Sequence, residues 1–254
     1  MPAHPLNIVA GLFAAGLLAC APAHAGHVNT SANLSNIQFQ LIDLDLTDNI
    51  TPSITFQNKQ SGGQLSYVQG AEGGSNSFSG FDTFSAAYTN GSVSATSTAT
   101  SLQAQAQART SPVAQGQELT VSVSARQELS FTLSPSTRLI FSAQGDAFVD
   151  QADIDWTSPD ASIGAWIETN INGVSVHDES YSSITSSQGK RSRFLQGSVD
   201  TGTAIATGML TASASVNFHD TGTIGPVPEP ETYGMLMAGL LVLGGVARRK
   251  ARKA

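Results

Sequence analysis

Hydrophobic and polar residues alternate with a period of two along most of the chain between residues 26 and 224. The clearest runs cover residues 119–123, 129–133, 139–143, 163–167 and 210–218. In an extended strand, this alternation turns one face towards a core and the other towards solvent. Many such strands, separated by turn residues, predict an all-β fold: an antiparallel β-sandwich with a jelly-roll-like arrangement.

Two turn signals join pairs of these strands. Residues 134–137 read Ser-Pro-Ser-Thr, and they predict a hairpin between the strands at 129–133 and 139–143. Asn172-Gly173 is the dipeptide most typical of a two-residue hairpin, and it predicts a second one. Residues 102–108 alternate apolar residues with Gln. This pattern favours a strand, although Ala and Gln favour helix in isolation.

Three segments depart from regular alternation. The apolar phase changes between Leu41 and Ile42, which predicts a β-bulge at that point. Residues 60–80 and 89–101 are rich in Gly, Ser and Thr, and we expect loops in both segments.

The first 25 residues have the pattern of a secretory signal peptide. Residues 8–19 are apolar over a typical length, and Ala23-His24-Ala25 fits the small-x-small cleavage pattern. Cleavage after Ala25 makes Gly26 the mature N-terminus. Residues 1–7 depart from the pattern because they contain no Lys or Arg.

The single cysteine, Cys20, allows a second interpretation of this end. It follows Leu17-Leu18-Ala19, which resembles a lipobox, and a lipidated Cys20 would then be the mature first residue. The alternative is that Cys20 is a small apolar residue inside a cleaved signal peptide. In that case the mature chain has no disulfide and no thiol chemistry.

The charge of the body argues against nucleic acid as a partner. The chain has 12 Lys and Arg and 19 Asp and Glu. Residues 225–254 hold five of the former and two of the latter, and residues 1–25 hold neither, so the body has 7 basic and 17 acidic residues. Phosphate binding needs clustered cations. The one basic cluster, at residues 190–193, is more simply an exposed turn.

The C-terminal 30 residues combine three features in order. Val227, Pro228, Glu229 and Pro230 form an extended polar spacer, because proline fixes its own φ and pushes the preceding residue towards extended geometry. Residues 233–247 are apolar and predict a short transmembrane helix. The basic end at 248–253 holds five cations that act as a cytoplasmic membrane stop. These are Arg248, Arg249, Lys250, Arg252 and Lys253.

This ordered combination resembles the PEP-CTERM sorting signal of Gram-negative bacteria. The resemblance implies export by the general secretion machinery, an inner-membrane intermediate, and cutting near Pro-Glu-Pro by an exosortase. It also implies a final location at the cell surface or in an exopolysaccharide-containing biofilm matrix. The expected organisation is a signal peptide at 1–25, an extracytoplasmic β-sandwich domain at 26–224 and a sorting tail at 225–254.

One acidic cluster is a candidate metal site. Asp150, Asp153 and Asp155 can offer three carboxylates from one loop to Ca²⁺, which takes several oxygen ligands, and Asp146 and Asp160 lie nearby. The spacing lacks the glycine and the distal glutamate of an EF-hand. A solvated acidic loop explains the same residues, so we expect no cofactor, with Ca²⁺ as the alternative.

No catalytic motif stands out in the body. His177-Asp178 and His219-Asp220 are sequence neighbours, but no Gly-x-Ser-x-Gly elbow accompanies them. Four glutamates can in principle pair as glycosidase carboxylates, but their spacing selects no pair. They are Glu118, Glu128, Glu168 and Glu179. We therefore expect a non-enzymatic surface or matrix protein.

The alternative is a secreted carbohydrate-binding module or polysaccharide-active enzyme with the same tail. Trp156, Trp166 and Tyr181 can form an aromatic platform for sugars. Trp166 lies opposite the apolar face of its strand, so we expect it to point outward. Core or edge packing is the simpler interpretation of a tryptophan in a strand.

Overall fold

The computed structural model describes residues 26–110, 118–152, 154–171 and 173–221, and these form strands joined by turns and short loops. The described strands are β1 (Gly26–Asp43), β2 (Ile54–Gln69), β3 (Glu72–Ser79), β4 (Thr83–Tyr88), β5 (Gly91–Ser97), β6 (Leu102–Thr110), β7 (Leu119–Leu133), β8 (Thr137–Ala152), β9 (Trp156–Ile171), β10 (Val174–Thr185), β11 (Gly189–Asp200) and β12 (Ala206–Asp220). The predicted signal peptide, transmembrane helix and basic end lie outside the described residues. Within the described part, no helix is long and apolar enough to span a membrane.

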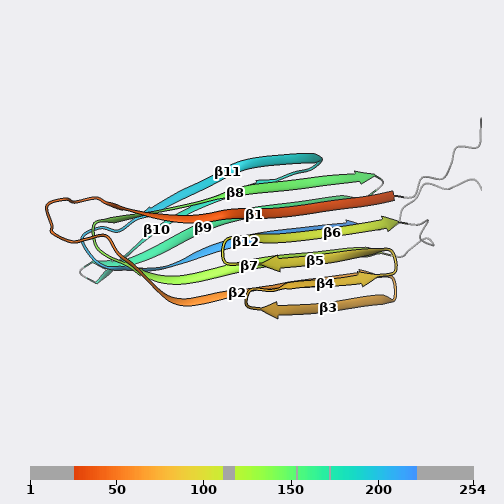
Figure 1. Cartoon of the computed structure of the whole chain (residues 1–254), viewed down its shortest axis with the longest axis horizontal. Coiled ribbons are helices and arrows are strands. Elements are labelled where there is room, and N and C mark those ends of the chain that lie inside the picture. Colours follow the sequence, from red (N-terminus) through yellow and green to blue (C-terminus); the bar gives the residue numbers. More distant parts are fainter. Residues whose placement is uncertain (1–25, 111–117, 153, 172, 222–254) are drawn as a thin grey trace, which may run out of the picture. The chain divides into compact units, whose positions relative to one another are not determined.

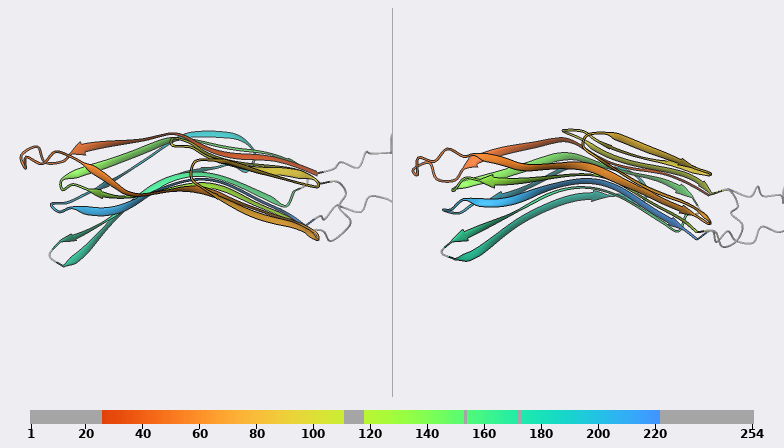
Figure 2. Two further views of the ribbon diagram at one scale, coloured as in Figure 1. Left: turned by 60° about the horizontal axis from the view of Figure 1, so that its bottom comes forward. Right: turned by 90° about the horizontal axis from the view of Figure 1, so that it is seen from below.

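Two six-stranded sheets pack face to face (Figures 1 and 2). Sheet A has the order β11-β8-β1-β6-β5-β4, and sheet B has the order β10-β9-β12-β7-β2-β3. All the pairings between neighbouring strands are antiparallel. The predicted all-β antiparallel sandwich is confirmed. Its two six-stranded sheets differ from the jelly roll that we favoured, which has eight strands in two Greek keys.

The hairpin predicted at residues 134–137 is wrong. This turn joins β7 of sheet B to β8 of sheet A, so the two strands do not pair with each other. The turn is instead held by neighbouring loops, because Ser134 N donates to Ser53 O at 3.0 Å and Ser136 N donates to Gly202 O at 2.8 Å. A turn between strands of one sheet and a turn between two sheets share the same flanking alternation, so the sequence did not distinguish them.

The hairpin predicted at Asn172-Gly173 is confirmed. Ile171 of β9 faces Val174 of β10 across it, and Gly173 adopts a φ of 83°, which a residue without a Cβ reaches without strain. Gly173 N also donates to Asn170 Oδ1 at 2.9 Å. The strand predicted at 102–108 is likewise confirmed as part of β6.

Two other local predictions need correction. The register of β1 against β8 shifts between Ser35 and Gln38, where Asn36 has a φ of 55°, rather than at Leu41-Ile42. Residues 60–80 and 89–101 form β2, β3 and β5 instead of loops. Most Ser and Thr residues of these strands lie on the solvent face, so a composition typical of loops here belongs to a sheet with a polar outer surface.

The sandwich has two unlike halves. β1 begins and β12 ends at the same end of the sandwich (Figure 1), and we call this half the terminal half. There sheet A has all its strands, because β6 pairs with β1 only from Gly26 to Leu34, and β5 and β4 follow outside β6. The other half, the loop half, contains the β1–β2 loop and the β9–β10 hairpin. Beyond the bulge, sheet A is reduced to β1, β8 and β11.

The cores of the two halves differ in side-chain size. In the terminal half, small residues dominate the buried face of both sheets. They include Ala32, Ala104, Ala106, Ala108, Ala125, Ala161, Ala214, Val93, Val121 and Val123. In the loop half, large residues fill the interior. They include Phe131, Leu133, Leu139, Phe141, Ile167 and Leu210, with Phe39 and Phe56 at the margin.

Candidate functional site

The last described strand, β12, ends in a small polar cluster around Asp155 and Thr221. Asp155 Oδ2 accepts hydrogen bonds from both the backbone N and the Oγ1 of Thr221, each at 2.8 Å. These two bonds, with a smaller contribution from the charge of His219, lower the pKa of Asp155. The described chain therefore stays attached to the sheet up to Thr221.

His219 of β12 continues this cluster across sheet B. Its Nδ1 lies 3.0 Å from Thr120 Oγ1 and 3.4 Å from Glu118 Oε1. Its ring lies 6.3 Å from that of Trp156 on β9. These contacts link the end of β12 to its neighbours on both sides, because Thr120 lies on β7 and Trp156 on β9.

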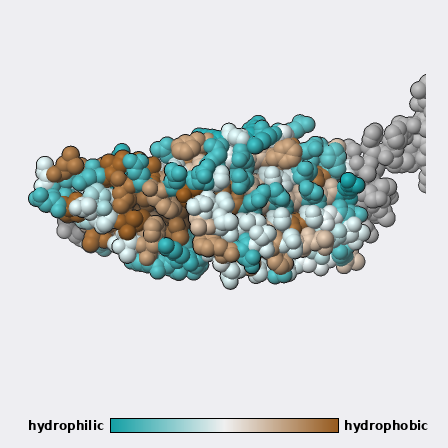
Figure 3. Space-filling view, in the orientation of Figure 1, coloured by the Kyte–Doolittle hydropathy of each residue, from teal (hydrophilic) through white to brown (hydrophobic). Residues whose placement is uncertain are grey.

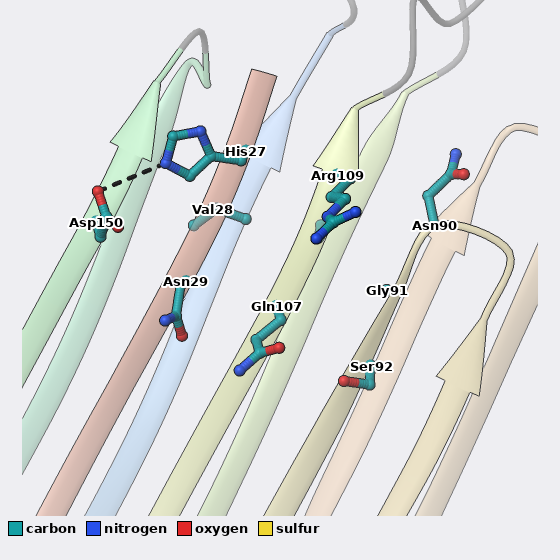
Figure 4. A pocket seen from close by; sticks show the side chains of 10 residues that line it. His27, Val28, Asn29, Asn90, Gly91, Ser92, Gln107, Arg109 and Asp150 are labelled. Atoms are coloured by element: carbon teal, nitrogen blue, oxygen red, sulfur yellow. Dashed lines mark ion pairs between the residues drawn. The ribbon is translucent and has the colours of Figure 1, made fainter. Parts of the chain in front are cut away.

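A shallow hollow of about 400 Å³ lies on the outer face of sheet A (Figure 4). It crosses β8, β1, β6 and β5 near the end where β1 begins. Polar side chains line most of it: His27, Asn29, Asn90, Ser92, Gln107, Arg109 and Asp150. His27 Nε2 lies 3.5 Å from Asp150 Oδ1, and both side chains are about half exposed or more.

The side chains of this hollow can form hydrogen bonds with hydroxyl-rich ligands. Its amides and hydroxyls both donate and accept hydrogen bonds, and Arg109 and Asp150 add one charge of each sign. The hollow is open and has no aromatic wall among its lining residues. A ligand would therefore be held by hydrogen bonds at a wet surface, not enclosed.

The three aromatic residues predicted as a platform share one face. Along β9, Trp156 and Trp166 alternate with the core positions, and Tyr181 of β10 faces Gly164, so all three lie on the outer face of sheet B. Tyr181 is 67% exposed, and its ring covers Gly164. The ring of Trp166 stacks on the ring of His177, with 5.9 Å between the ring centroids. The strand register separates Trp156 from the other two, so Trp166 and Tyr181 form the local pair.

The predicted acidic cluster is spread over several elements. Asp150 lies on β8, with its Oδ1 3.5 Å from His27 Nε2, and Asp155 accepts hydrogen bonds from Thr221. Asp146 contacts Ser192 and lies 3.8 Å from Lys190 Nζ. Among the described residues, no group of three or more His, Cys, Asp or Glu side chains can hold a metal ion. Asp153 lies outside the described residues, so the Ca²⁺ triad stays a prediction.

The His-Asp pairs do not point at a common centre. His177 pairs with Glu179 at 3.4 Å, while Asp178 Oδ2 accepts a hydrogen bond from the backbone of Asp200 at 2.9 Å. Residues adjacent in a strand point to opposite faces, so each histidine is directed away from the aspartate that follows it. Glu168 and Glu179 do lie on neighbouring positions of the outer face of sheet B, on either side of the Trp166–His177 stack.

Most of the residues that line the hollow could not be predicted as a group from the sequence. Gln103, Gln105 and Gln107 were visible as the polar half of an alternating strand, and that pattern correctly put them on the solvent face. Their neighbours, Asn29 on β1 and Ser92 on β5, come together only through strand pairing. No periodic signal in the sequence shows which strands are adjacent.

Comparison with family models matches residues 226–253 to the PEP-CTERM protein-sorting motif. The chain carries a PEP-CTERM sorting signal. This signal implies an exosortase as the processing partner, with export and sorting at the membrane. Its predicted elements, Val227 to Pro230 and the cations from Arg248 to Lys253, lie within the matched segment but outside the described residues. Comparisons with curated proteins and with solved structures found no match.

Proposed function

We propose that this chain is a non-enzymatic protein of the cell surface or extracellular matrix, which an exosortase processes through its PEP-CTERM signal. The match at residues 226–253 supports the sorting part of this proposal. The β-sandwich is the cargo, and its role is to present two broad polar sheet faces. Both outer faces carry mainly Ser, Thr, Asn and Gln, whose small or planar polar groups suit contact with hydrated polymers.

The point at which the tail leaves the sandwich supports a separation of roles. β12 is fastened to its neighbours up to Thr221, five residues before the matched segment starts at residue 226. In the sequence, the Pro-Glu-Pro residues therefore come after the last described strand, β12. Changes in the motif should affect processing without affecting the fold.

The test replaces Pro228, Glu229 and Pro230 together by alanine in a host with an active exosortase. We expect uncut protein to accumulate in the inner membrane, with an unchanged melting temperature. The matched control replaces Thr223 and Ile224 by alanine and should mature normally. Cell fractionation and mass spectrometry of the mature ends supply the measurement. Normal maturation of the triple variant would contradict the sorting proposal.

A second function, carbohydrate binding, is favoured by the Trp166–Tyr181 pair. The exposed ring of Tyr181 lies next to Gly164 and can contact the apolar side of a sugar ring, and nearby Glu179 and Glu168 can accept hydrogen bonds from hydroxyls. Co-sedimentation of the protein with cellulose and chitin tests this function. Tyr181→Ala should abolish binding, whereas Phe194→Ala, an exposed aromatic on the outer face of sheet A, should leave it unchanged. Absence of binding by the unaltered protein removes this second function.

A further inference from the structure

The two long sides of the sandwich have very different edges. One side is formed by β10 and β11, and the other by β3 and β4. An edge strand exposes unpaired backbone N–H and C=O groups, which can pair with a strand of another chain. Natural sheets usually prevent this pairing with charged side chains, proline or a covering segment. An edge strand without these features is open to pairing.

The β10–β11 side is closed and charged. The two strands follow each other across the two sheets, and Asp178 of β10 accepts a hydrogen bond from the backbone N of Asp200 on β11 at 2.9 Å. The connection is fixed by the buried Ser186, whose hydroxyl bonds the carbonyls of Gln188 and Gly189. β11 also carries Lys190, Arg191 and Arg193, the type of side chain that keeps other strands away from an edge.

The β3–β4 side lacks these devices. β3 reads Glu-Gly-Gly-Ser-Asn-Ser-Phe-Ser and β4 reads Thr-Phe-Ser-Ala-Ala-Tyr, so Glu72 is the one charged residue and neither strand contains proline. Gly and Ser predominate in β3, and a second backbone can approach such small side chains closely. Phe81, in the turn that joins the two strands, is 62% exposed, so this edge also has an apolar margin.

Because the β3–β4 side carries almost no charge, two copies of the chain can approach each other there with little electrostatic repulsion. The body has 17 acidic and 7 basic residues, so two copies repel each other over most of their surfaces. β3 and β4 bring almost no charge to a contact. An antiparallel strand pair between identical chains is also self-complementary, because a two-fold axis exchanges the two strands.

We propose that β3 pairs with β3 of a second copy of this chain, antiparallel, about a two-fold axis normal to the sheets. Sheet B then continues from one copy into the other, which is strand addition at an open edge. The assembly stops at two copies because the remaining sides, formed by β10 and β11, are closed and charged. The predicted product is a dimer and not a filament.

The pleat of the sheet restricts the register of this pairing. A two-fold axis normal to the sheet keeps inward residues inward, so facing residues must have numbers whose sum is even. In β3, Gly74, Asn76 and Phe78 share the inner face, because they pair with the inward positions of β2. A register centred on Asn76 sets Ser75 opposite Ser77 of the second copy. It also leaves Glu72 beyond the last residue pair of β3, where its charge is not opposed to the other carboxylate.

Cysteine cross-linking in the full-length chain tests both the contact and its register. Cys20 is the only natural cysteine, so the unaltered chain supplies the background. Facing residues in an antiparallel pair have Cα atoms about 4.5–5.5 Å apart, within disulfide range. After export and mild oxidation, Asn76→Cys should run as a covalent dimer on a non-reducing gel.

The register predicts a contrast with the next position. Ser77→Cys alone should not cross-link, because its own counterpart lies two residues along the strand, about 7 Å further. A mixture of Ser75→Cys and Ser77→Cys chains should cross-link. Equal cross-linking of Ser77→Cys alone and Asn76→Cys would overturn the register, and no cross-linking above background in any of these samples would overturn the contact.

Charge placed on the edge gives a second measurement. Ser75→Lys with Ser77→Lys adds two cations to exposed positions of β3. This double variant should abolish the dimer in size-exclusion chromatography with light scattering of the full-length chain in detergent. Its melting temperature at low protein concentration should not change. Thr185→Lys, on the exposed face of the charged edge strand β10, is the matched control and should remain dimeric. A dimer that survives the double substitution refutes the proposal.

Discussion

The terminal and loop halves of the sandwich bury their cores by different means. In the terminal half, sheet A has all six of its strands, and Ala and Val make up most of the buried positions between the sheets. In the loop half, sheet A narrows to three strands, and Phe, Leu and Ile take over. Where fewer strands contribute to the core, each inward position must bury more apolar area to maintain a comparable interior.

The surfaces of the two halves also differ: the loop half exposes more large apolar side chains than the terminal half. The large apolar side chains left partly exposed gather mainly in the loop half, as the space-filling view shows (Figure 3). They include Ile42, Leu44, Leu46, Ile50, Val174, Val176 and Ile205. The terminal half instead carries the hollow of Figure 4 and a mostly uncharged polar surface. A narrow sheet covers its core less completely, so apolar side chains remain at its margin.

The largest expected effect comes from emptying the loop-half core. Phe141 is fully buried, and its ring packs against Gly197 of β11, where no side chain can replace it. Phe141→Ala should lower the free energy of unfolding by about 3–5 kcal/mol, the usual cost of removing a buried ring. Urea denaturation followed by tryptophan fluorescence measures this loss.

The control for this variant is Phe194→Ala. Phe194 is 60% exposed on β11, so its loss should change the free energy of unfolding by no more than about 0.5 kcal/mol. Equal losses at Phe141 and Phe194 would show that the large side chains of the loop half do not carry its stability.

The core of the terminal half should be destabilised by a larger side chain rather than by the loss of one. Ala104 of β6 is fully buried and lies between Ala32 of β1 and Ala95 of β5. Ala104→Leu inserts three carbon atoms between two extended sheets and should cost about 1–3 kcal/mol, measured by the same denaturation. Ala87→Leu, at an exposed position of β4, is the control and should be nearly neutral. A stabilised Ala104→Leu variant would mean that the small-residue core leaves unfilled space.

The pattern of single strands could be predicted from sequence, but their partners could not. Alternation correctly assigned the buried faces at 163–167 and 210–218, because burial of one strand face depends on local periodicity. The Ser134–Thr137 turn shows the limit. Its sequence fits a hairpin and a crossover between sheets equally, and the crossover was chosen by distant contacts with Ser53 and Gly202.

The same limit applied to the candidate sites. The sorting signal is a linear motif, so its residues could be recognised without any fold. The hollow on sheet A and the neutral β3 edge depend on which strands are neighbours and which are outermost. Segment 60–80 was interpreted as a loop because of its Gly and Ser content, and those same residues make β3 an open edge.

The smallest effect expected distinguishes two carboxylates: Asp160 on the outer face of β9, and Asp155, which comes just before β9 and binds Thr221. Asp160 on β9 is partly buried, and burial raises its pKa above the ordinary 3.8, although a hydrogen bond with Ser162 partly opposes this shift. The folded state therefore binds the proton more tightly than the unfolded chain. The resulting stability is fully present below pH 3.8 and is lost as the pH rises through the raised pKa.

At neutral pH the ionised Asp160 should thus weaken the fold, and Asp160→Asn should raise the melting temperature slightly. This gain should vanish below pH 3.8, where the aspartate is already protonated. Asp155→Asn should behave in the opposite way, because hydrogen bonds from Thr221 lower the pKa of Asp155. Its stabilising contribution is present above pH 3.8 and is lost as the pH falls through the lowered pKa. Melting curves of both variants across this pH range would expose an error if Asp160→Asn were destabilising at neutral pH.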